Sequence, residues 1–86
     1  MTVWATPFPT KEQMQRLDKI EKLRWNGGAL PSSCLQNYIY YLVFGYDNCA
    51  YLLYGSYESS WTKCTFEEFE YNIKKYFGLI WEQEDL

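Results

Sequence analysis

The sequence feature that most constrains the fold is an unbroken run of aromatic and aliphatic residues at positions 38–44, which reads YIYYLVF. Residues of this kind pack well in strands, and a run with no polar side indicates a strand that is covered on both faces. A chain of 86 residues has room for one compact domain. The run therefore predicts a small α+β protein with this segment as its central strand.

Two segments carry the signature of a helix start. Thr10 and Gln13, and again Thr65 and Glu68, have the spacing of a capping box, in which a threonine hydroxyl and a longer side chain satisfy free backbone N–H groups. Each pair precedes apolar residues at helical spacing, so each predicts a helix. The helices are expected at residues 10–26 and 65–77.

Two further strands are expected, at residues 49–54 and 57–63, with turns at 45–48 and 55–56. The predicted order is α-β-β-β-α, with a three-stranded antiparallel sheet and both helices on one face. The whole chain is interpreted as a single domain. Its parts are an N-terminal segment (1–9), a helix (10–26), the sheet (37–63), a helix (65–77) and an acidic tail (78–86).

The strands also predict which side chains share a face of the sheet. A loop of two or four residues places even positions of the first strand beside odd positions of the second. The third strand is polar at Glu58, Ser60 and Thr62, so that side is expected to face water while Ile39 and Trp61 face the helices. Six large side chains are then left uncovered: Tyr38, Tyr40, Leu42, Phe44, Tyr51 and Leu53.

A bare apolar face of that size exceeds what soluble monomers normally expose. We therefore expect a cover, which is a partner protein, a second copy of the chain in a homodimer, or Val3, Trp4 and Phe8 of the N-terminal segment. If the two faces of the sheet are assigned incorrectly, no such cover is needed. If a partner protein or a second copy covers the face, the contact residues are Tyr38, Tyr40, Phe44 and Tyr51.

The charge of the chain is small, negative and uneven. The net charge is −3, and residues 44–86 hold three basic and eight acidic side chains. A basic partner surface would therefore meet the C-terminal half first. The expected contacts are the carboxylates of Glu67, Glu68, Glu70, Glu82, Glu84 and Asp85, with Trp81 as an aromatic anchor. The alternative is that the helix glutamates only stabilise the positive N-terminal end of their helix.

Catalytic and metal chemistry find little support. Histidine, the commonest general base and metal ligand, is absent, and no Gly-rich phosphate loop or nucleophile motif occurs. Cys34, Cys49 and Cys64 form no Cys-x-x-Cys pair and are expected to be reduced and metal-free. Neither a membrane-spanning run nor a signal-peptide pattern is seen. We expect a cytoplasmic, non-enzymatic protein without a cofactor.

Nucleic-acid binding is disfavoured by the distribution of charge. The predicted element order is similar to that of double-stranded-RNA-binding domains, whose last helix begins with lysines, but here that helix begins with Glu67 and Glu68. Tyr38, Tyr40 and Tyr51 would offer a stacking platform for single strands, but few Lys or Arg residues surround them.

The function that these observations favour is inhibition by protein binding. Tyr and Trp dominate interface hot spots, and a small acidic chain is suited to occluding a partner's nucleic-acid-binding or catalytic surface. Phage anti-defence inhibitors, anti-CRISPR proteins included, and bacterial immunity proteins are similar in size and acidity, although no motif here identifies either group. The alternatives are a homo-oligomeric assembly protein that uses the aromatic face, or a binder of single-stranded nucleic acid or a small ligand.

Overall fold

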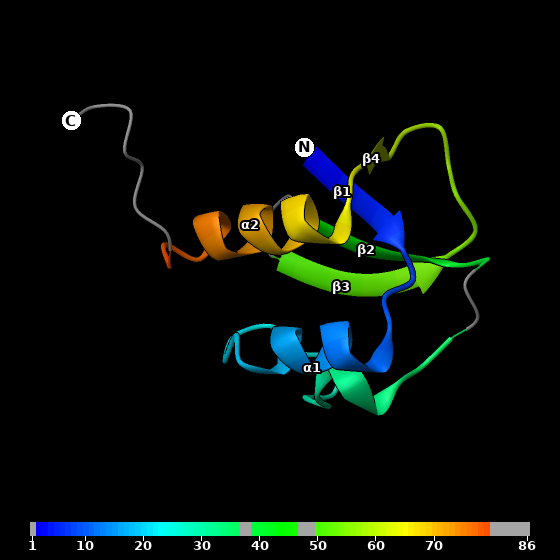
Figure 1. Ribbon diagram of the computed structural model, residues 1–86. Coiled ribbons are helices and arrows are strands. Elements are labelled where there is room, and N and C mark those ends of the chain that lie inside the picture. The colour runs from blue at the N-terminus through cyan, green and yellow to red at the C-terminus, as the bar shows by residue number, and fades with distance from the viewer. Residues whose placement is uncertain (1, 37–38, 47–49, 80–86) are drawn as a thin grey trace.

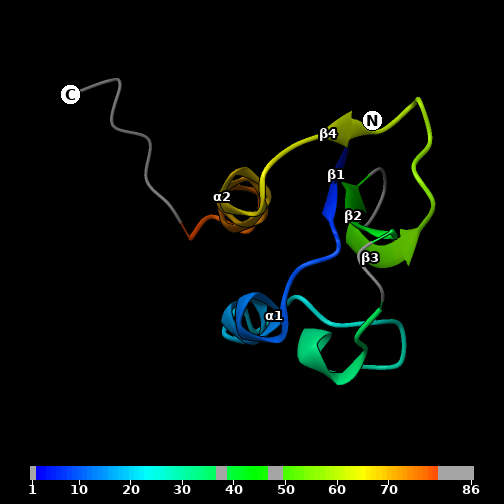
Figure 2. The same ribbon diagram turned by 45° about the vertical axis from the view of Figure 1, so that its right-hand side comes forward.

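The computed structural model describes residues 2–36, 39–46 and 50–79. Within them, the strands form one four-stranded sheet in the order β3-β2-β1-β4, and both helices lie on the same side of it (Figures 1 and 2). The α+β fold with helices on one face is confirmed, and the sheet has one strand more than predicted. The elements are β1 (Thr2–Pro7), α1 (Lys11–Asp18), the 3₁₀ turn η1 (Pro31–Ser33), β2 (Tyr41–Tyr46), β3 (Ala50–Gly55), β4 (Thr62–Lys63) and α2 (Phe66–Tyr76).

The additional strand, β1, comes from the N-terminal segment. It lies inside the sheet, antiparallel to β2 on one side and parallel to β4 on the other. Aromatic and β-branched residues such as Trp4 and Thr6 suit a strand, and Pro7 stands at its last position, where a missing N–H is tolerated. The alternative in which this segment lies across an open sheet face is therefore wrong. It is a central strand instead.

The predicted assignment of the sheet faces is also wrong, because of the loop between β2 and β3. Tyr46 pairs with Ala50, so three residues connect the strands, and an odd number reverses the partition that two or four would give. The side facing the helices carries Trp4, Thr6, Leu42, Phe44, Leu52 and Tyr54. The other side, called the open face below, carries Ala5, Tyr41, Val43, Tyr51, Leu53 and Lys63.

The hydrophobic core lies between the sheet and the two helices. Phe44 of β2 and Phe69 of α2 are fully buried in it, as are Met14 and Leu17 of α1. Burial of such side chains is the main favourable term in folding. The cluster consists of Phe8, Met14, Leu17, Ile20, Leu23, Leu42, Phe44, Leu52, Phe66, Phe69 and Ile73.

The two helices differ in how closely they follow the prediction. α2 spans residues 66–76, within the expected 65–77, but α1 ends at Asp18 rather than at residue 26. Beyond it, Ile20 N–H donates to the Leu17 carbonyl and Leu23 N–H to that of Ile20, so the chain continues in three-residue turns. Such turns keep the three apolar side chains on one side, which explains their spacing in the sequence.

The third predicted strand is much shorter than expected. Only Thr62 and Lys63 are extended, and they pair with β1 rather than with β3. The chain before them contains a turn, closed by a 3.0 Å bond from Trp61 N–H to the Glu58 carbonyl. β2 and β3 are displaced by one to three residues from the expected strands, and Gly45 lies in β2 rather than in a turn.

Candidate protein-binding site

The structure separates the residues predicted to contact a partner. Phe44 is fully buried in the core, so its prediction as a contact residue is wrong. Tyr40 is half-buried and packs against the same core, with its ring 6.0 Å from that of Tyr54. Tyr51 lies on the opposite side, with its ring across Gly45, where any Cβ would collide with it. Tyr38, Trp81, Glu82, Glu84 and Asp85 lie outside the described residues.

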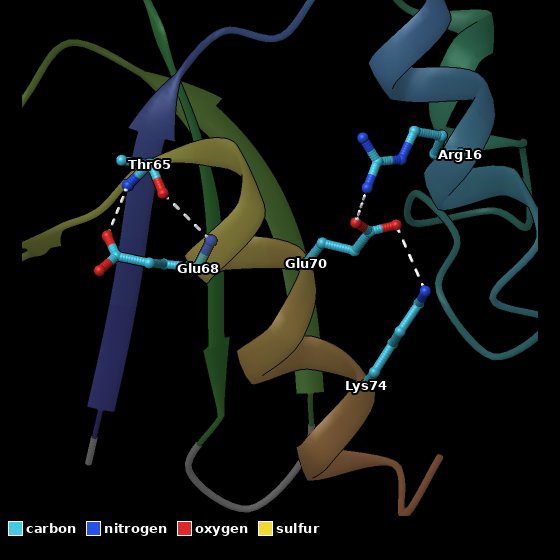
Figure 3. Close-up of polar contacts among 5 residues, drawn as sticks. All are labelled: Arg16, Thr65, Glu68, Glu70 and Lys74. Atoms are coloured by element: carbon cyan, nitrogen blue, oxygen red, sulfur yellow. Dashed lines mark hydrogen bonds and ion pairs between the residues drawn. The ribbon is translucent and has the colours of Figure 1, made fainter. Parts of the chain in front are cut away.

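Glu70 has a structural role that makes it unavailable to a partner. Its carboxylate accepts a hydrogen bond from Arg16 of α1 and lies 3.4 Å from the Lys74 ammonium (Figure 3). Only 7% of Glu70 is exposed, and a buried carboxylate of this kind requires charged partners. The prediction of Glu70 as a contact residue is therefore wrong, because this side chain joins the two helices.

Glu67, by contrast, remains free to contact another molecule. It is exposed at the second position of α2, and within the described residues no hydrogen bond or ion pair involves its carboxylate. Glu70, three residues further along the helix, is buried instead. Glu67 therefore keeps its predicted place at a candidate binding surface.

Glu67 lies beside an open groove of about 590 Å³ between α2 and β4, called the α2–β4 groove below. Two aromatic side chains, Trp4 of β1 and Tyr71 of α2, line it together with two carboxylates, those of Glu67 and Glu68. Trp4 and Thr62 are paired neighbours on the helix-facing side of the sheet. The remaining lining residues are Thr62, Lys63, Cys64 and Asn72.

Glu68 is fixed in position by the capping box of α2. Its Oε1 accepts a 2.9 Å hydrogen bond from Thr65 N–H, and Thr65 Oγ1 accepts one of 3.2 Å from Glu68 N–H (Figure 3). The predicted capping box is confirmed. One carboxylate oxygen is thereby used within the helix, so Glu67 supplies the freer negative charge.

The Lys63 ammonium lies over aromatic rings of the open face, although Lys63 also lines the groove. Lys63 is on the open face, where its Nζ lies 4.3 Å from the ring centroid of Tyr57 and 5.8 Å from that of Tyr41. A cation over an aromatic ring is attracted by the negative ring face. The α2–β4 groove therefore has negative polarity although a lysine contributes to its lining.

Cys64 also lines the groove, as a neutral thiol. Its burial, and next the carboxylate of Glu68, raise the pKa of Cys64 to about 11. Cys34 and Cys64 are both free thiols, whereas Cys49 lies outside the described residues. In the described part of the chain, no group of three or more His, Cys, Asp or Glu side chains is arranged to hold a metal ion.

A second hollow lies beside β4 and is called the open-face groove below. Its volume is about 400 Å³, and Pro7 and Tyr41 supply its apolar surface. Tyr41 also belongs to an aromatic group, in which the ring of Tyr57 lies 5.5 Å from that of Tyr41 and 6.2 Å from that of Trp61. The other lining residues are Lys63, Cys64, Thr65 and Glu68, of which Lys63, Cys64 and Glu68 also line the α2–β4 groove.

The sequence predicts the carboxylates of this site but not its aromatic residues. Tyr71 follows Glu67 by four positions, and such a spacing places two residues on the same side of a helix, so this signal was present. Trp4 had no comparable signal, because it reaches the groove only through the parallel pairing of β1 with β4. That pairing joins residues separated by 58 positions.

Comparisons of the chain with protein-family models, with curated proteins and with solved structures found no match. Among the described residues, no helix has the length and apolar character needed to cross a membrane. The candidate site therefore rests on the geometry of this chain alone: two carboxylates and two aromatic side chains around one groove at the edge of the sheet.

Proposed function

We propose that this chain is a small protein-binding inhibitor, which docks on a basic surface of a partner and occludes it. The α2–β4 groove receives a Lys or Arg side chain of that partner. The observation that carries this proposal is the convergence of Glu67 and Glu68 with Trp4 and Tyr71 in a single groove. The net charge of −3 favours the same class of partner.

The chemistry of the groove is suited to a cationic side chain. Carboxylates form charge-assisted hydrogen bonds with ammonium and guanidinium groups, and Trp and Tyr rings attract cations on their faces. The aliphatic part of a Lys or Arg side chain packs on apolar surface at the same time. A volume of about 590 Å³ is ample for one such side chain.

In this proposal the chain acts by stoichiometric occlusion in the cytoplasm, without catalysis. The occluded surface is a nucleic-acid-binding or catalytic one, as with the phage anti-defence inhibitors and immunity proteins of similar size and acidity. Proteins that bind nucleic acid carry clustered Lys and Arg residues, which is the chemistry that this groove selects.

The test uses a short arginine-rich peptide as a probe and compares two matched variants. Glu67 and Glu12 both occupy the second position of a helix with a capping box, and both are exposed, but only Glu67 lines the groove. The variants are Glu67→Gln and Glu12→Gln, and binding is followed by NMR at low salt. We expect Glu67→Gln to weaken binding about fivefold and Glu12→Gln to leave it unchanged.

The same titration locates the site on the protein. Resonances of the Trp4 indole and the Asn72 amide should shift on addition of the peptide, because both side chains line the groove. Equal effects of the two substitutions, or shifts confined to other residues, would place the basic partner elsewhere.

A second candidate function, homo-oligomeric assembly, is favoured by the open face. Leu53 and Tyr57 are each about two-fifths exposed there, beside Tyr41 and Trp61. Self-association through this face should appear as a dimer in sedimentation equilibrium, and Leu53→Asp should shift it to a monomer. A wild-type protein that stays monomeric at high concentration removes this candidate.

A further inference from the structure

We propose that the partner contributes an extended segment that joins the free edge of β4 as a fifth strand, with alternate side chains entering the two grooves. This inference rests on the proposed function and specifies how the basic segment binds. It predicts a recognition pattern, in which a basic residue is followed by an apolar one.

The free edge of β4 presents backbone groups for such pairing. β4 is the last strand of the sheet, so no described strand lies on its outer side (Figure 2). Cys64 N–H donates a 2.9 Å hydrogen bond inward, to the Ala5 carbonyl of β1. Because successive residues of a strand direct their backbone groups to opposite edges, the N–H and C=O of Lys63 point outward.

The two grooves lie on opposite sides of this edge. Trp4 and Thr62 mark the helix-facing side at the α2–β4 groove, whereas Tyr41 and Lys63 mark the open face at the other. An added strand directs successive side chains to opposite faces of the sheet. Consecutive residues of a bound segment therefore enter different grooves.

Charge complementarity decides which residue enters which groove. A basic side chain fits the α2–β4 groove beside Glu67 and Glu68. The open-face groove shares Lys63 and Glu68 with it but lacks Glu67, so its charged side chains balance. Pro7 and Tyr41 give this second groove apolar surface. The segment therefore alternates basic and apolar side chains.

The opposite edge of the sheet has the wrong charge for this ligand. The groove beside β3 is lined by Arg24, and none of the residues that line it is acidic. Within the two residues of β4, only Lys63 directs its backbone groups outward, so the backbone pairing is short and the two grooves set which side chains bind.

The experiment uses a short synthetic peptide in which Lys and Val alternate, together with two N-methylated forms of it. One form carries methyl groups on the lysine amides and the other on the valine amides, so the methyl groups lie on opposite edges of an added strand. One form should bind about fivefold to tenfold more weakly than the parent peptide, and the other should bind as the parent does. The Lys63 amide should also exchange more slowly with solvent when the parent peptide is bound.

The outcomes separate this inference from the proposed function. If the two methylated forms bind equally, or if the Lys63 amide exchange is unchanged, strand addition is overturned, while binding that depends on Glu67 still supports a basic ligand. If the parent peptide does not bind but the arginine-rich peptide does, only strand addition is overturned. If neither peptide binds, both proposals fail. Without peptide, the Lys63 amide could also exchange more slowly as the protein concentration rises. That result would mean that a second copy of the chain pairs with this edge, and it would overturn the inference.

Discussion

At the scale of single residues, the polar link between the two helices at Glu70 contributes to stability. We predict that Glu70→Ala lowers the free energy of unfolding by about 1–2 kcal/mol, because it removes the carboxylate that Arg16 and Lys74 share. The loss is moderated because the side chain of Arg16 is about half exposed and remains hydrated. Urea unfolding of the variants measures it.

A double-mutant cycle isolates the interaction itself. Glu70→Ala and Arg16→Ala should show a coupling energy of about 1 kcal/mol, whereas Glu67→Ala, on the same helix but exposed, should change stability by less than about 0.5 kcal/mol. A coupling near zero would mean that Glu70 is held by packing alone.

The thiol of Cys64 gives a pH-dependent prediction. Its pKa is raised from 9.0 to about 11 by burial and by the Glu68 carboxylate, so the folded state disfavours the thiolate. The stabilisation is complete below pH 9 and is lost as the pH rises to about 11. The stability advantage of the wild type over Cys64→Ala should therefore shrink across this window, by about 1 kcal/mol for a partly exposed thiol.

Unfolding of both proteins in urea at several alkaline pH values measures this difference. The comparison with Cys64→Ala also removes the contribution of every other group, because both proteins share those groups. A difference in stability that stays constant from pH 8 to pH 11 would show that the thiol is not shielded from solvent.

At the scale of elements, β1 is the strand on which the sheet depends. We predict that deletion of residues 1–7 abolishes cooperative folding, because β1 pairs with both β2 and β4 and contributes the buried Ala5. The amide resonances should collapse into a narrow range, and the thermal transition should disappear. By contrast, Thr10→Ala, which removes only the cap of α1, should retain the fold and cost about 1 kcal/mol.

Retention of a cooperative transition in the deleted chain would contradict this role. It would show that β2, β3 and the helices form a sufficient core by themselves.

The elements that the sequence predicted well are those with local signals. Each capping box joins residues three positions apart, and Thr10 and Thr65 mark the helix starts correctly. The strand pairing of β1 has no such signal, since its partners are distant in the chain. The assignment of the two sheet faces depended on whether the loop between β2 and β3 has an odd or an even number of residues. One residue more or fewer in that loop exchanges the predicted core and surface.

The candidate site could be predicted only in part for the same reason. Glu67 and Glu68 follow a helix start that the sequence shows, but the ring of Trp4 is brought to them by the sheet. Phe44 was assigned to the surface because its neighbours in the sheet were assigned incorrectly, although its hydrophobic character equally suits a core.

At the scale of the whole molecule, the uneven charge should govern the rate of association. With a partner isolated from host cells by affinity capture, Glu67→Lys should slow association, and the effect should diminish as salt is added. Glu12→Lys, at the equivalent position of α1, should have a much smaller effect. Stopped-flow measurements at two ionic strengths test this, and equal rates for the two variants would locate the steering charges elsewhere.

The position of β1 between β2 and β4 also has a consequence for folding during synthesis. β1 is made before the strands that pair with it. Its residue Trp4 pairs with Phe44, 40 positions later, and with Thr62, 58 positions later. Contacts this distant in sequence slow folding, because a long loop must close before they form. The sheet is therefore completed only after Lys63 has left the ribosome, and until then β1 keeps an unpaired edge to which another extended chain could pair.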